Sequence, residues 1–369
     1  MSDSSIKMKK ILILGDANSS HIDKWASGIV SLGYTVKIFS LTAYTDSSFK
    51  EKGIDVYTSS YAGKNKLWYP FAIDELWQLI KDFKPDIIHA HYASSYGLLG
   101  ALSRFHPYIL SVWGSDVYGF PKMSALHKRI FKFNLRKADR LCSTSNTMKE
   151  EIRKYTNKDI SVIPFGVDLN RFKPLPVHHV FKGDAIVVGT VKTLEKEYGL
   201  EYLIEAFALL KKRLKEYPLK LLIVGKGSLE MELKEKAQSL GIQGDVVFTG
   251  YISPIEVPFY QNMLTISVFP SLNESFGVSV VEAMACEKPV IATNVGGLPE
   301  VVENNVTGII VPPANAEKLA EAMETLVRDE QLRTKFGKEG RQRVERLYNW
   351  NNNLASMSQI YQEVLSEKA

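Results

Sequence analysis

The sequence predicts an α/β protein built from two doubly wound, Rossmann-like domains in tandem. Short apolar runs rich in β-branched residues alternate with helix-like segments along the 369 residues, which is typical of parallel sheets covered by helices. A chain of this length also suits about two domains. The alternation starts afresh with the strand AIVVGTVK after a stretch that contains two prolines. We therefore expect a first domain over residues 1–173, a linker over 174–184 and a second domain over 185–347.

The composition is that of an ordinary soluble globular protein, with 45% hydrophobic and 24% charged residues. Its two cysteines, Cys142 and Cys286, lie in apolar surroundings and offer neither a disulfide framework nor a metal-binding spacing. The opening segment leads straight into the strand ILILG without a signal-peptide pattern, and no apolar run reaches the length of a membrane span. We therefore expect a cytoplasmic protein.

Basic residues are concentrated in the first half of the chain. Up to Lys173 there are 25 Lys and Arg against 16 Asp and Glu, whereas the remainder has 21 against 25. A basic half favours an acidic partner or an anionic surface. Because no motif for DNA or RNA binding accompanies this charge, we expect an anionic membrane surface, at the inner face of the cytoplasmic membrane, rather than nucleic acid.

Residues 265–300 carry the strongest functional pattern, a strand, a loop, a helix and a second strand. A helix that begins near Gly277 directs free amides and the positive end of its dipole at the preceding loop, where a phosphate fits. Carboxylates accept hydrogen bonds from the paired hydroxyls of a sugar or a ribose. The predicted contacts are a sugar at Glu274, a ribose at Glu282, and a pyrophosphate at the segment Ser275, Phe276, Gly277 and Val278.

The flanking pattern points to a family. Seven residues separate Glu274 from Glu282, which opens Glu-Ala-Met-Ala; a Pro-Val-Ile-Ala strand and Gly-Gly-Leu-Pro-Glu follow. In this order the pattern resembles the retaining glycosyltransferases of family 4 (glycosyl transferases group 1), which have the GT-B fold. The resemblance implies two Rossmann-like domains facing across a cleft, a last helix over 348–369 that packs back on the first domain, and a nucleotide diphosphate sugar as donor. It implies no cofactor, and because the chain has no Asp-x-Asp motif we expect no obligatory metal.

The resemblance also implies cationic groups for the donor phosphates. The family places an arginine and a lysine after the first strand of the second domain, but here those positions fall on Thr193 and Tyr198. We expect Lys192 and Lys196, which stand nearby, to supply the charge. Other predicted donor contacts are the glycines that follow the strand LKLLIV and the residues that border the base, namely Gly225, Gly227, Tyr251 and Ile252.

Candidate acceptor-side residues lie in the first half. In the strand DIIHAHY, His89 and His91 alternate, so both point to one face at the carboxyl end of the strand, where ligands gather in α/β sheets. We predict His91 as a polar wall of the acceptor pocket. The family carries a histidine beside the reacting sugar where this chain has Trp113, and Asp116 is then the best polar substitute; the alternative is that Asp116 only caps a turn.

The loop after the first strand adds two acceptor-side candidates, Asn18 and His21. For His21 the alternative is an ordinary histidine near a helix cap. Residues 122–137 are predicted to form a basic amphipathic helix, with Lys128, Arg129 and Lys132 among its cations. Such a helix can lie on an anionic membrane; the alternative is a domain helix with a solvated basic face.

Together these patterns predict a retaining glycosyltransferase that moves a sugar from a nucleotide diphosphate sugar to an acceptor hydroxyl. By the resemblance, the acceptor is a saccharide or a lipid-linked saccharide in cell-surface polysaccharide biosynthesis. One alternative is a GT-B sugar-nucleotide epimerase, which would need acid and base groups such as His89, His91 and Asp116. The other is a non-catalytic nucleotide-binding subunit. Acceptor dependence separates the glycosyltransferase from the epimerase, since an epimerase converts its sugar nucleotide with no acceptor present.

Overall fold

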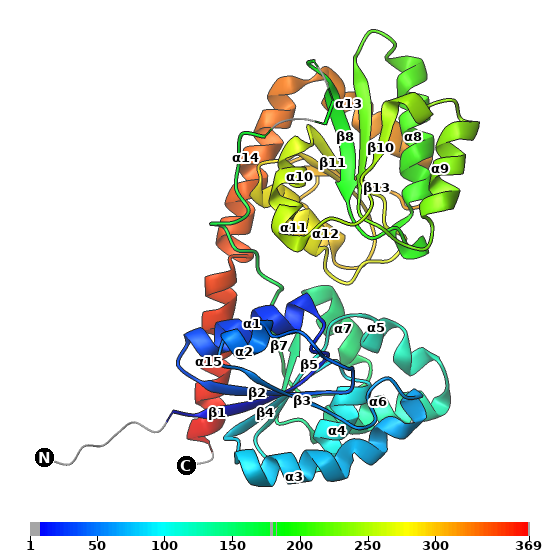
Figure 1. Cartoon of the computed structure of the whole chain (residues 1–369). Helices are drawn as coiled ribbons and strands as arrows, with labels where there is room; N and C mark the ends of the chain where they lie inside the picture. The colour runs from blue at the N-terminus through cyan, green and yellow to red at the C-terminus, as the bar shows by residue number, and fades with distance from the viewer. Residues whose placement is uncertain (1–7, 178–179, 182, 368–369) are drawn as a thin grey trace, which may run out of the picture. The chain divides into compact units, whose positions relative to one another are not determined.

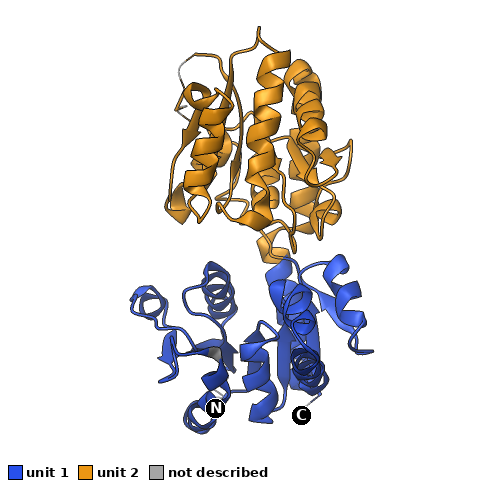
Figure 2. Ribbon diagram, turned by 90° about the vertical axis from the view of Figure 1, so that its right-hand side faces the viewer, with its two compact units in different colours: residues 1–164, 353–369 blue, residues 165–352 orange. Residues whose placement is uncertain are grey.

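The computed structural model describes residues 8–177, 180–181 and 183–367. They form two compact units, one within residues 1–164 and 353–369 and one of residues 165–352 (Figure 2). The first boundary lies earlier in the chain than the expected domain end at Lys173. Of the expected linker over 174–184, residues 178–179 and 182 lie outside the described residues.

The chain returns to the first unit at Asn353, inside helix α15 (Trp350–Ser366). The hydroxyl of Tyr361 on this helix lies 2.7 Å from His89 Nδ1. The last helix is therefore part of the first unit and packs on its sheet.

The described residues of the first unit form a seven-stranded sheet in the order β3-β2-β1-β4-β5-β6-β7, and all its pairs are parallel (Figure 1). The chain winds from β1 toward β3, crosses back to β4 and then winds the other way, so the switch point lies between β1 and β4. The strands are β1 (Lys10–Leu14), β2 (Thr35–Ser40), β3 (Asp55–Thr58), β4 (Ile87–His91), β5 (Tyr108–Ser111), β6 (Arg140–Ser143) and β7 (Ile160–Val162).

Helices cover both faces of this sheet. The α-helices before α15 are α1 (Ser20–Ser31), α2 (Ser48–Glu51), α3 (Ile73–Phe83), α4 (Ser95–Ser103), α5 (Ser115–Tyr118), α6 (Ala125–Lys137) and α7 (Asn146–Arg153). Two 3-10 helices are η1 (Lys66–Ala72) and η2 (Phe120–Lys122). One core cluster joins Ile88 and Ala90 of β4 to apolar side chains of α3, α4, α6 and α7, which therefore share one face. His89 and His91 alternate with them and face the other side, toward α1 and α15.

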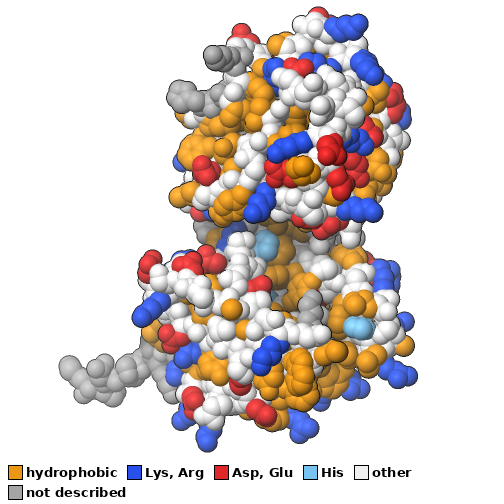
Figure 3. All heavy atoms as spheres, turned by 45° about the vertical axis from the view of Figure 1, so that its right-hand side comes forward, with side chains coloured by type: hydrophobic (Ala, Val, Ile, Leu, Met, Phe, Trp, Pro, Cys, Tyr) orange, Lys and Arg blue, Asp and Glu red, His pale blue; other side chains and the backbone are white. Residues whose placement is uncertain are grey.

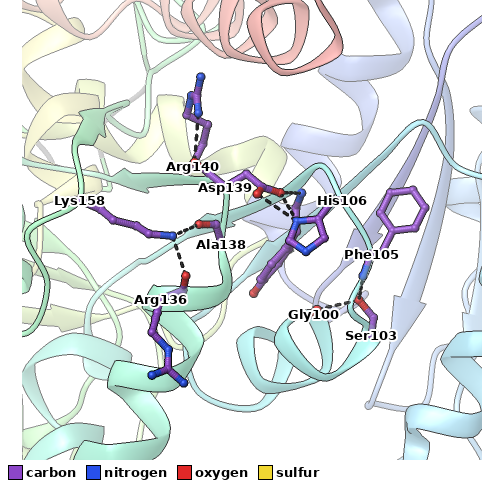
Figure 4. A network of polar contacts seen from close by, with 10 residues as sticks. Gly100, Ser103, Phe105, His106, Arg136, Ala138, Asp139, Arg140 and Lys158 are labelled. Atoms are coloured by element: carbon purple, nitrogen blue, oxygen red, sulfur yellow. Dashed lines mark hydrogen bonds and ion pairs between the residues drawn. The ribbon is translucent and has the colours of Figure 1, made fainter. Parts of the chain in front are cut away.

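A polar network connects the first residues of β5 and β6, at the amino ends of these strands (Figure 4). Asp139 accepts a hydrogen bond from the Tyr108 amide at 2.6 Å, and its other contact is His106 Nδ1 at 2.9 Å. Lys158 Nζ donates to the Arg136 carbonyl at 2.7 Å and also to the Ala138 carbonyl. Burial lowers the pKa of Lys158. These contacts anchor the carboxyl end of α6 on the sheet.

The described residues of the second unit form a six-stranded parallel sheet in the order β10-β9-β8-β11-β12-β13. Its strands are β8 (Ile186–Val191), β9 (Leu219–Val224), β10 (Val246–Phe248), β11 (Ile266–Phe269), β12 (Val290–Thr293) and β13 (Gly308–Val311). The chain again reverses its winding direction, here between β8 and β11, so the crevice for a ligand is expected at their carboxyl ends.

The α-helices of the second unit are α8 (Leu200–Arg213), α9 (Glu230–Ser239), α10 (Val257–Met263), α11 (Val278–Ala285), α12 (Leu298–Val301), α13 (Ala316–Arg328) and α14 (Glu330–Leu347). Its 3-10 helices are η3 (Lys196–Tyr198), η4 (Gln243–Asp245) and η5 (Pro254–Glu256). A large core cluster joins α8, α9 and α13 to one face of the sheet, and a smaller one lies between the other face and α10.

Two details differ from the expected elements. The basic helix predicted over 122–137 begins at Ala125, because Ser124 caps it by accepting from the His127 amide at 3.3 Å. Helix α14 was not among the predicted elements. None of the helices formed by the described residues combines the length and the apolar character that crossing a membrane requires.

Candidate active site

The switch point of the second unit brings two loops together. β8 and β11 are neighbours in the sheet, and residues 192–199 follow β8 while residues 270–277 follow β11. The amides of Leu272 and Asn273 donate to the Glu197 carbonyl at 2.8 and 3.1 Å. The loop that carries Glu274 is thus fastened to the loop that carries Lys192.

Lys192 and Glu274 form an ion pair at this point. Lys192 Nζ donates to Glu274 Oε2 at 2.6 Å, and each side chain is only 13% exposed. The Nζ also lies 4.0 Å from the centroid of the Tyr198 ring, whose face attracts a cation. Charges interact more strongly in such partly dry surroundings than in water. The structure therefore joins a predicted phosphate-binding residue to the predicted sugar-binding carboxylate.

A glycine turn supports the Glu274 loop from the other side. The Gly297 amide donates to the Glu274 carbonyl at 3.1 Å. A Cβ at Gly296 would lie 1.7 Å from that carbonyl oxygen, and one at Gly297 would lie 2.5 Å from the Ser275 carbonyl oxygen. Because no side chain fits between the two backbones, this Gly-Gly pair sets the position of the loop.

Helix α14 braces the same turn through α12. Arg343 Nη2 and the Tyr348 hydroxyl both donate to the Glu300 carbonyl at 3.0 Å, and Arg343 Nε donates to the Val301 carbonyl at 2.9 Å. The Tyr348 ring meets Phe276 edge-on, with centroids 5.4 Å apart. Burial raises the pKa of Tyr348 to about 12, so its hydroxyl stays a donor at neutral pH. Arg343 and Tyr348 therefore stabilise the position of the Glu274 loop through their contacts with α12 and Phe276.

The start of α11 provides an anion site next to Glu274. Gly277 caps the helix with φ +101°, and among the described residues no side chain caps its first amides, which is the arrangement that suits an anion. Phe276 is 2% exposed, and its ring packs on Phe165 and Tyr348 and is therefore not open to a ligand. Glu282 lies partly buried in the second turn of α11.

The remaining donor-side candidates are Gly225, Gly227, Tyr251, Ile252 and Lys196, and no ion pair or hydrogen bond among the described residues joins them to the Lys192–Glu274 pair. A Cβ at Gly225 would lie 2.1 Å from the Lys192 carbonyl oxygen and one at Gly227 would lie 2.4 Å from the Leu194 carbonyl oxygen. The close approach at these glycines is therefore to the protein's own loop. Tyr251 is 71% exposed, while Ile252 packs on the smaller core cluster. Lys196 is exposed in η3, and among the described residues no ion pair joins it to Glu274.

The first unit gathers three acceptor-side candidates at the carboxyl end of its sheet. His91 is 1% exposed, and its ring centroid lies 5.1 Å from that of Trp113, which in turn lies 5.6 Å from that of His21. Neither ring nitrogen of His91 has a hydrogen-bond partner among the described residues. Burial lowers the pKa of His91 well below its ordinary value, and His89 and His21 lower it further. A neutral imidazole that can still donate and accept one bond is thus present.

Asp116 and Asn18 have local partners instead. Asp116 is fully buried, and its oxygens accept from the amides of Ala93 and Gly114 at 2.7 Å and of Trp113 at 3.1 Å. This geometry favours the alternative that Asp116 caps a turn; in doing so it positions Trp113. The Asn18 side chain donates to the Ala43 carbonyl at 2.9 Å and so connects the loop after β1 to the loop after β2.

Comparison with known proteins identifies the family. The profile of the family described as "Glycosyl transferases group 1" matches residues 173–343, and that described as "Glycosyl transferase 4-like" matches residues 10–145. Together these matches support a glycosyltransferase of the group 1 type. The capsular polysaccharide biosynthesis glycosyltransferase CapM of Staphylococcus aureus is 33% identical, over 61% of this chain and 59% of CapM. A D-inositol 3-phosphate glycosyltransferase of Corynebacterium kroppenstedtii is 26% identical, over 95% of this chain and 86% of the relative.

Solved structures agree on the fold of this glycosyltransferase. Sucrose-phosphate synthase from Thermosynechococcus elongatus has a TM-score of 0.81 at 21% identity, over 97% of this chain and 100% of that chain. HepE of Anabaena in complex with UDP-glucose has a TM-score of 0.80 at 19% identity, over 96% of this chain and 99% of that chain. These neighbours confirm the predicted GT-B class, with two parallel-sheet α/β domains.

Sequence reasoning about this glycosyltransferase missed three residues of the site. The sequence indicated Tyr198 only as a position where the family's lysine is missing, yet its ring contacts the Lys192 ammonium group. The sequence did not predict a role for Arg343 or Tyr348, because neither lies in the motif over residues 265–300. Both lie near the end of a polar helical stretch, and this was the only pattern that could have indicated them. Among the described residues no group of three or more His, Cys, Asp or Glu side chains is placed to hold a metal ion.

The buried histidines predict a loss of stability in mild acid. Burial lowers the pKa of His89 to about 3 and that of His91 well below its ordinary value, whereas in the unfolded chain both titrate near 6.5. Below pH 6.5 the unfolded state therefore binds more protons, and folding stability falls as pH falls. The expected slope is about 1.4 kcal/mol per pH unit for each histidine.

The measurement is the free energy of unfolding of the full chain in urea from pH 7.5 to pH 5. In a His91→Gln variant the slope should drop by about half between pH 6 and 5, because one titrating group is gone. The same slope in the variant and the wild type would show that His91 is not held neutral in the folded chain.

Proposed function

We propose that this glycosyltransferase transfers a sugar from a nucleotide diphosphate sugar to an acceptor hydroxyl with retention of the anomeric configuration. The observation that carries the proposal is the Lys192–Glu274 pair beside the uncapped start of α11. A diphosphate needs cations and amides, and a sugar needs an acceptor of hydroxyl hydrogen bonds. All three groups meet at the switch point of one sheet, which is where such ligands bind in doubly wound folds.

The proposed chemistry is dominated by stabilisation of the leaving group. The bond between the sugar's anomeric carbon and the diphosphate oxygen breaks, and the bond to the acceptor oxygen forms on the same face. The acceptor proton goes to the departing diphosphate. Lys192 and the amides of Phe276 to Val278 meet the charge that develops on the diphosphate, and preorganised groups of this kind lower a barrier most effectively. Glu274 orients the sugar, and Glu282 the ribose.

The acceptor side of the proposal rests on the first unit. His91, Trp113 and His21 offer one neutral donor-acceptor group and apolar ring surface, which suits a saccharide hydroxyl beside a sugar face. CapM is named for capsular polysaccharide biosynthesis, and this supports a saccharide or lipid-linked saccharide of the cell surface as acceptor. We propose that the enzyme meets such an acceptor at the cytoplasmic face of an anionic membrane.

The geometry gives the epimerase alternative no support. An epimerase needs both an acid and a base, yet of the three candidates only His91 lacks hydrogen-bond partners among the described residues, since both ring nitrogens of His89 are engaged by Tyr361 and Ser111 at 2.7 Å. The oxygens of Asp116 are likewise taken by backbone amides. We also propose that donor binding needs no metal ion, since cations and amides of the chain itself serve the diphosphate.

A thermal-melt screen with UDP, GDP and ADP, each with and without EDTA, tests the donor site. A nucleotide at 100 times its dissociation constant stabilises the folded state by about 2.7 kcal/mol, which shifts the melt of a domain of this size by about 5 °C or more. HepE was solved with UDP-glucose, so UDP is the first nucleotide to try. We expect one nucleotide to shift the melt equally with and without EDTA. No shift with any of them would overturn the proposal, and a shift that EDTA abolishes would overturn its metal-independent form.

A further inference from the structure

Large apolar side chains face the solvent along η1. Leu67 is 79% exposed, Phe71 56% and Trp68 53%. The rings of Trp68 and Phe71 lie 5.6 Å apart, so these side chains form one continuous surface. We name Leu67, Trp68 and Phe71 the apolar ridge. Single exposed apolar residues are common, but an adjoining group that includes a tryptophan is typical of a contact surface.

The ridge is held outward by the fold. Tyr69 and Ala72 of the same short helix turn inward and pack on the core cluster. The Asn65 side chain caps the helix by accepting from the Leu67 amide at 3.1 Å. Because the inner face of η1 is already filled, the ridge has no room to fold into the core.

A basic face accompanies the ridge. From Val117 to Ala138 the chain has no acidic residue. Lys128, Arg129 and Lys132 of α6 are exposed, and no ion pair among the described residues involves them. Met123 and Leu126, which are 69% and 63% exposed, stand at the start of the same helix. Phe131 and Leu135 of α6 are buried in the core, which leaves the cations on the outer side of the helix, where Lys128 Nζ lies 6.0 Å from the centroid of the Tyr155 ring.

The ridge and the basic face look out from one layer of the first unit. η1 leads directly into α3, and α3, α4 and α6 bury their inner faces in the same core cluster (Figure 1). α4 packs against η1 on one side and α6 on the other. Figure 3 shows hydrophobic side chains gathered on this face of the first unit, with Lys and Arg side chains among them. Their outer faces can therefore meet one flat partner at the same time.

We infer that this face docks on an anionic lipid bilayer, with the apolar ridge inserted among the headgroups and α6 over their phosphates. Exposed Trp, Phe and Leu beside unpaired Lys and Arg match the composition of an interfacial surface. A second copy of the chain would bring two basic faces together, which like charges oppose. The inference deepens the proposed function, on which it rests, by adding the apolar ridge to the basic helix that the sequence already pointed toward an anionic membrane.

Co-sedimentation of the full chain with vesicles tests the inference. Vesicles of phosphatidylcholine with phosphatidylglycerol are compared with phosphatidylcholine alone. Three variants are compared with the wild type: Leu67→Ser/Trp68→Ser/Phe71→Ser on the ridge, Lys128→Ser/Arg129→Ser/Lys132→Ser on α6, and a control, Met231→Ser/Leu240→Ser. The control residues are exposed apolar side chains of the second unit. All substituted positions lie at the surface, and thermal melts confirm that each variant is folded.

We expect the wild type and the control to bind the anionic vesicles, and the ridge and α6 variants each to bind at least about tenfold more weakly. Brominated lipid should quench part of the tryptophan fluorescence, and Trp68→Phe should remove that part. Equal binding by the ridge variant and the wild type would overturn the inference. So would a ridge-dependent dimer in light scattering without vesicle binding. Because donor-induced melt shifts do not involve this face, failure here is distinguishable from failure of the donor site.

Discussion

Replacing Glu274 by alanine is expected to reduce sugar release from the donor at least about a hundredfold, a rise of roughly 2.7 kcal/mol in the barrier. Glu274 pairs with Lys192 at 2.6 Å, and in the proposed function it also orients the sugar. Nucleoside diphosphate binding should survive, because the amides of α11 and the freed Lys192 remain. The measurement is donor turnover, paired with the melt shift given by the nucleotide alone.

The controls separate chemistry from folding. Glu274→Gln keeps the shape and one hydrogen-bond acceptor and should lose less activity than the alanine variant. Glu235→Ala removes an exposed carboxylate on α9 and should change nothing. If Glu274→Ala keeps activity within about threefold of the wild type, well under 1 kcal/mol in the barrier, then Glu274 does not hold the sugar.

Replacing Lys192 by alanine is expected to weaken nucleotide binding at least about tenfold and to lower kcat/KM about a hundredfold or more. The change removes the cation that we propose to face the diphosphate. It also leaves the Glu274 carboxylate unpaired in surroundings where each partner is only 13% exposed, so that it repels the donor. The measurement is the nucleotide-induced melt shift together with the kinetics of donor turnover.

Lys192→Arg keeps the charge and should restore most of the binding. Lys212→Ala, an exposed lysine of α8, serves as the matched control. The same experiment separates the two lysines predicted for the phosphates. The structure pairs Lys192 with Glu274 and leaves Lys196 exposed, so Lys196→Ala should have the smaller effect. A larger effect at Lys196 would show that the donor phosphates lie further along the η3 loop.

The fold could be predicted because its signals are local. Most of the buried strands are short apolar runs, because the strands of a parallel sheet are covered on both faces. Helix α14 gave no comparable signal, since it is strongly charged and buries little more than Phe336 and Val344 among its large side chains. The first compact unit ends before the expected boundary at Lys173, and Phe165, the first residue of the second unit, contacts Phe276, which lies far away in sequence.

The site could be predicted only where one motif carries it. Glu274, Gly277 and the start of α11 follow from a strand-loop-helix pattern, and the structure has this strand, loop and helix at these residues. The residues that support this loop could not be predicted, because Gly296 and Arg343 contact backbone carbonyl groups. Every residue has a carbonyl group, so the sequence does not indicate which of them will be contacted. Asp116 shows the opposite error: a carboxylate that looked like a reactive group is saturated by backbone amides.

One measurement tests the central claim most directly: a proton and phosphorus NMR time course of the enzyme with the sugar nucleotide that shifts its melt, without added acceptor and then with a saccharide acceptor. We predict release of the nucleoside diphosphate, slow with water as acceptor and faster with the saccharide. The first sugar product should keep the donor's anomeric configuration, and Glu274→Ala should abolish the signal. A product of inverted configuration, an epimerised sugar nucleotide, or a bound donor that never turns over would contradict retaining transfer at the Lys192–Glu274 site.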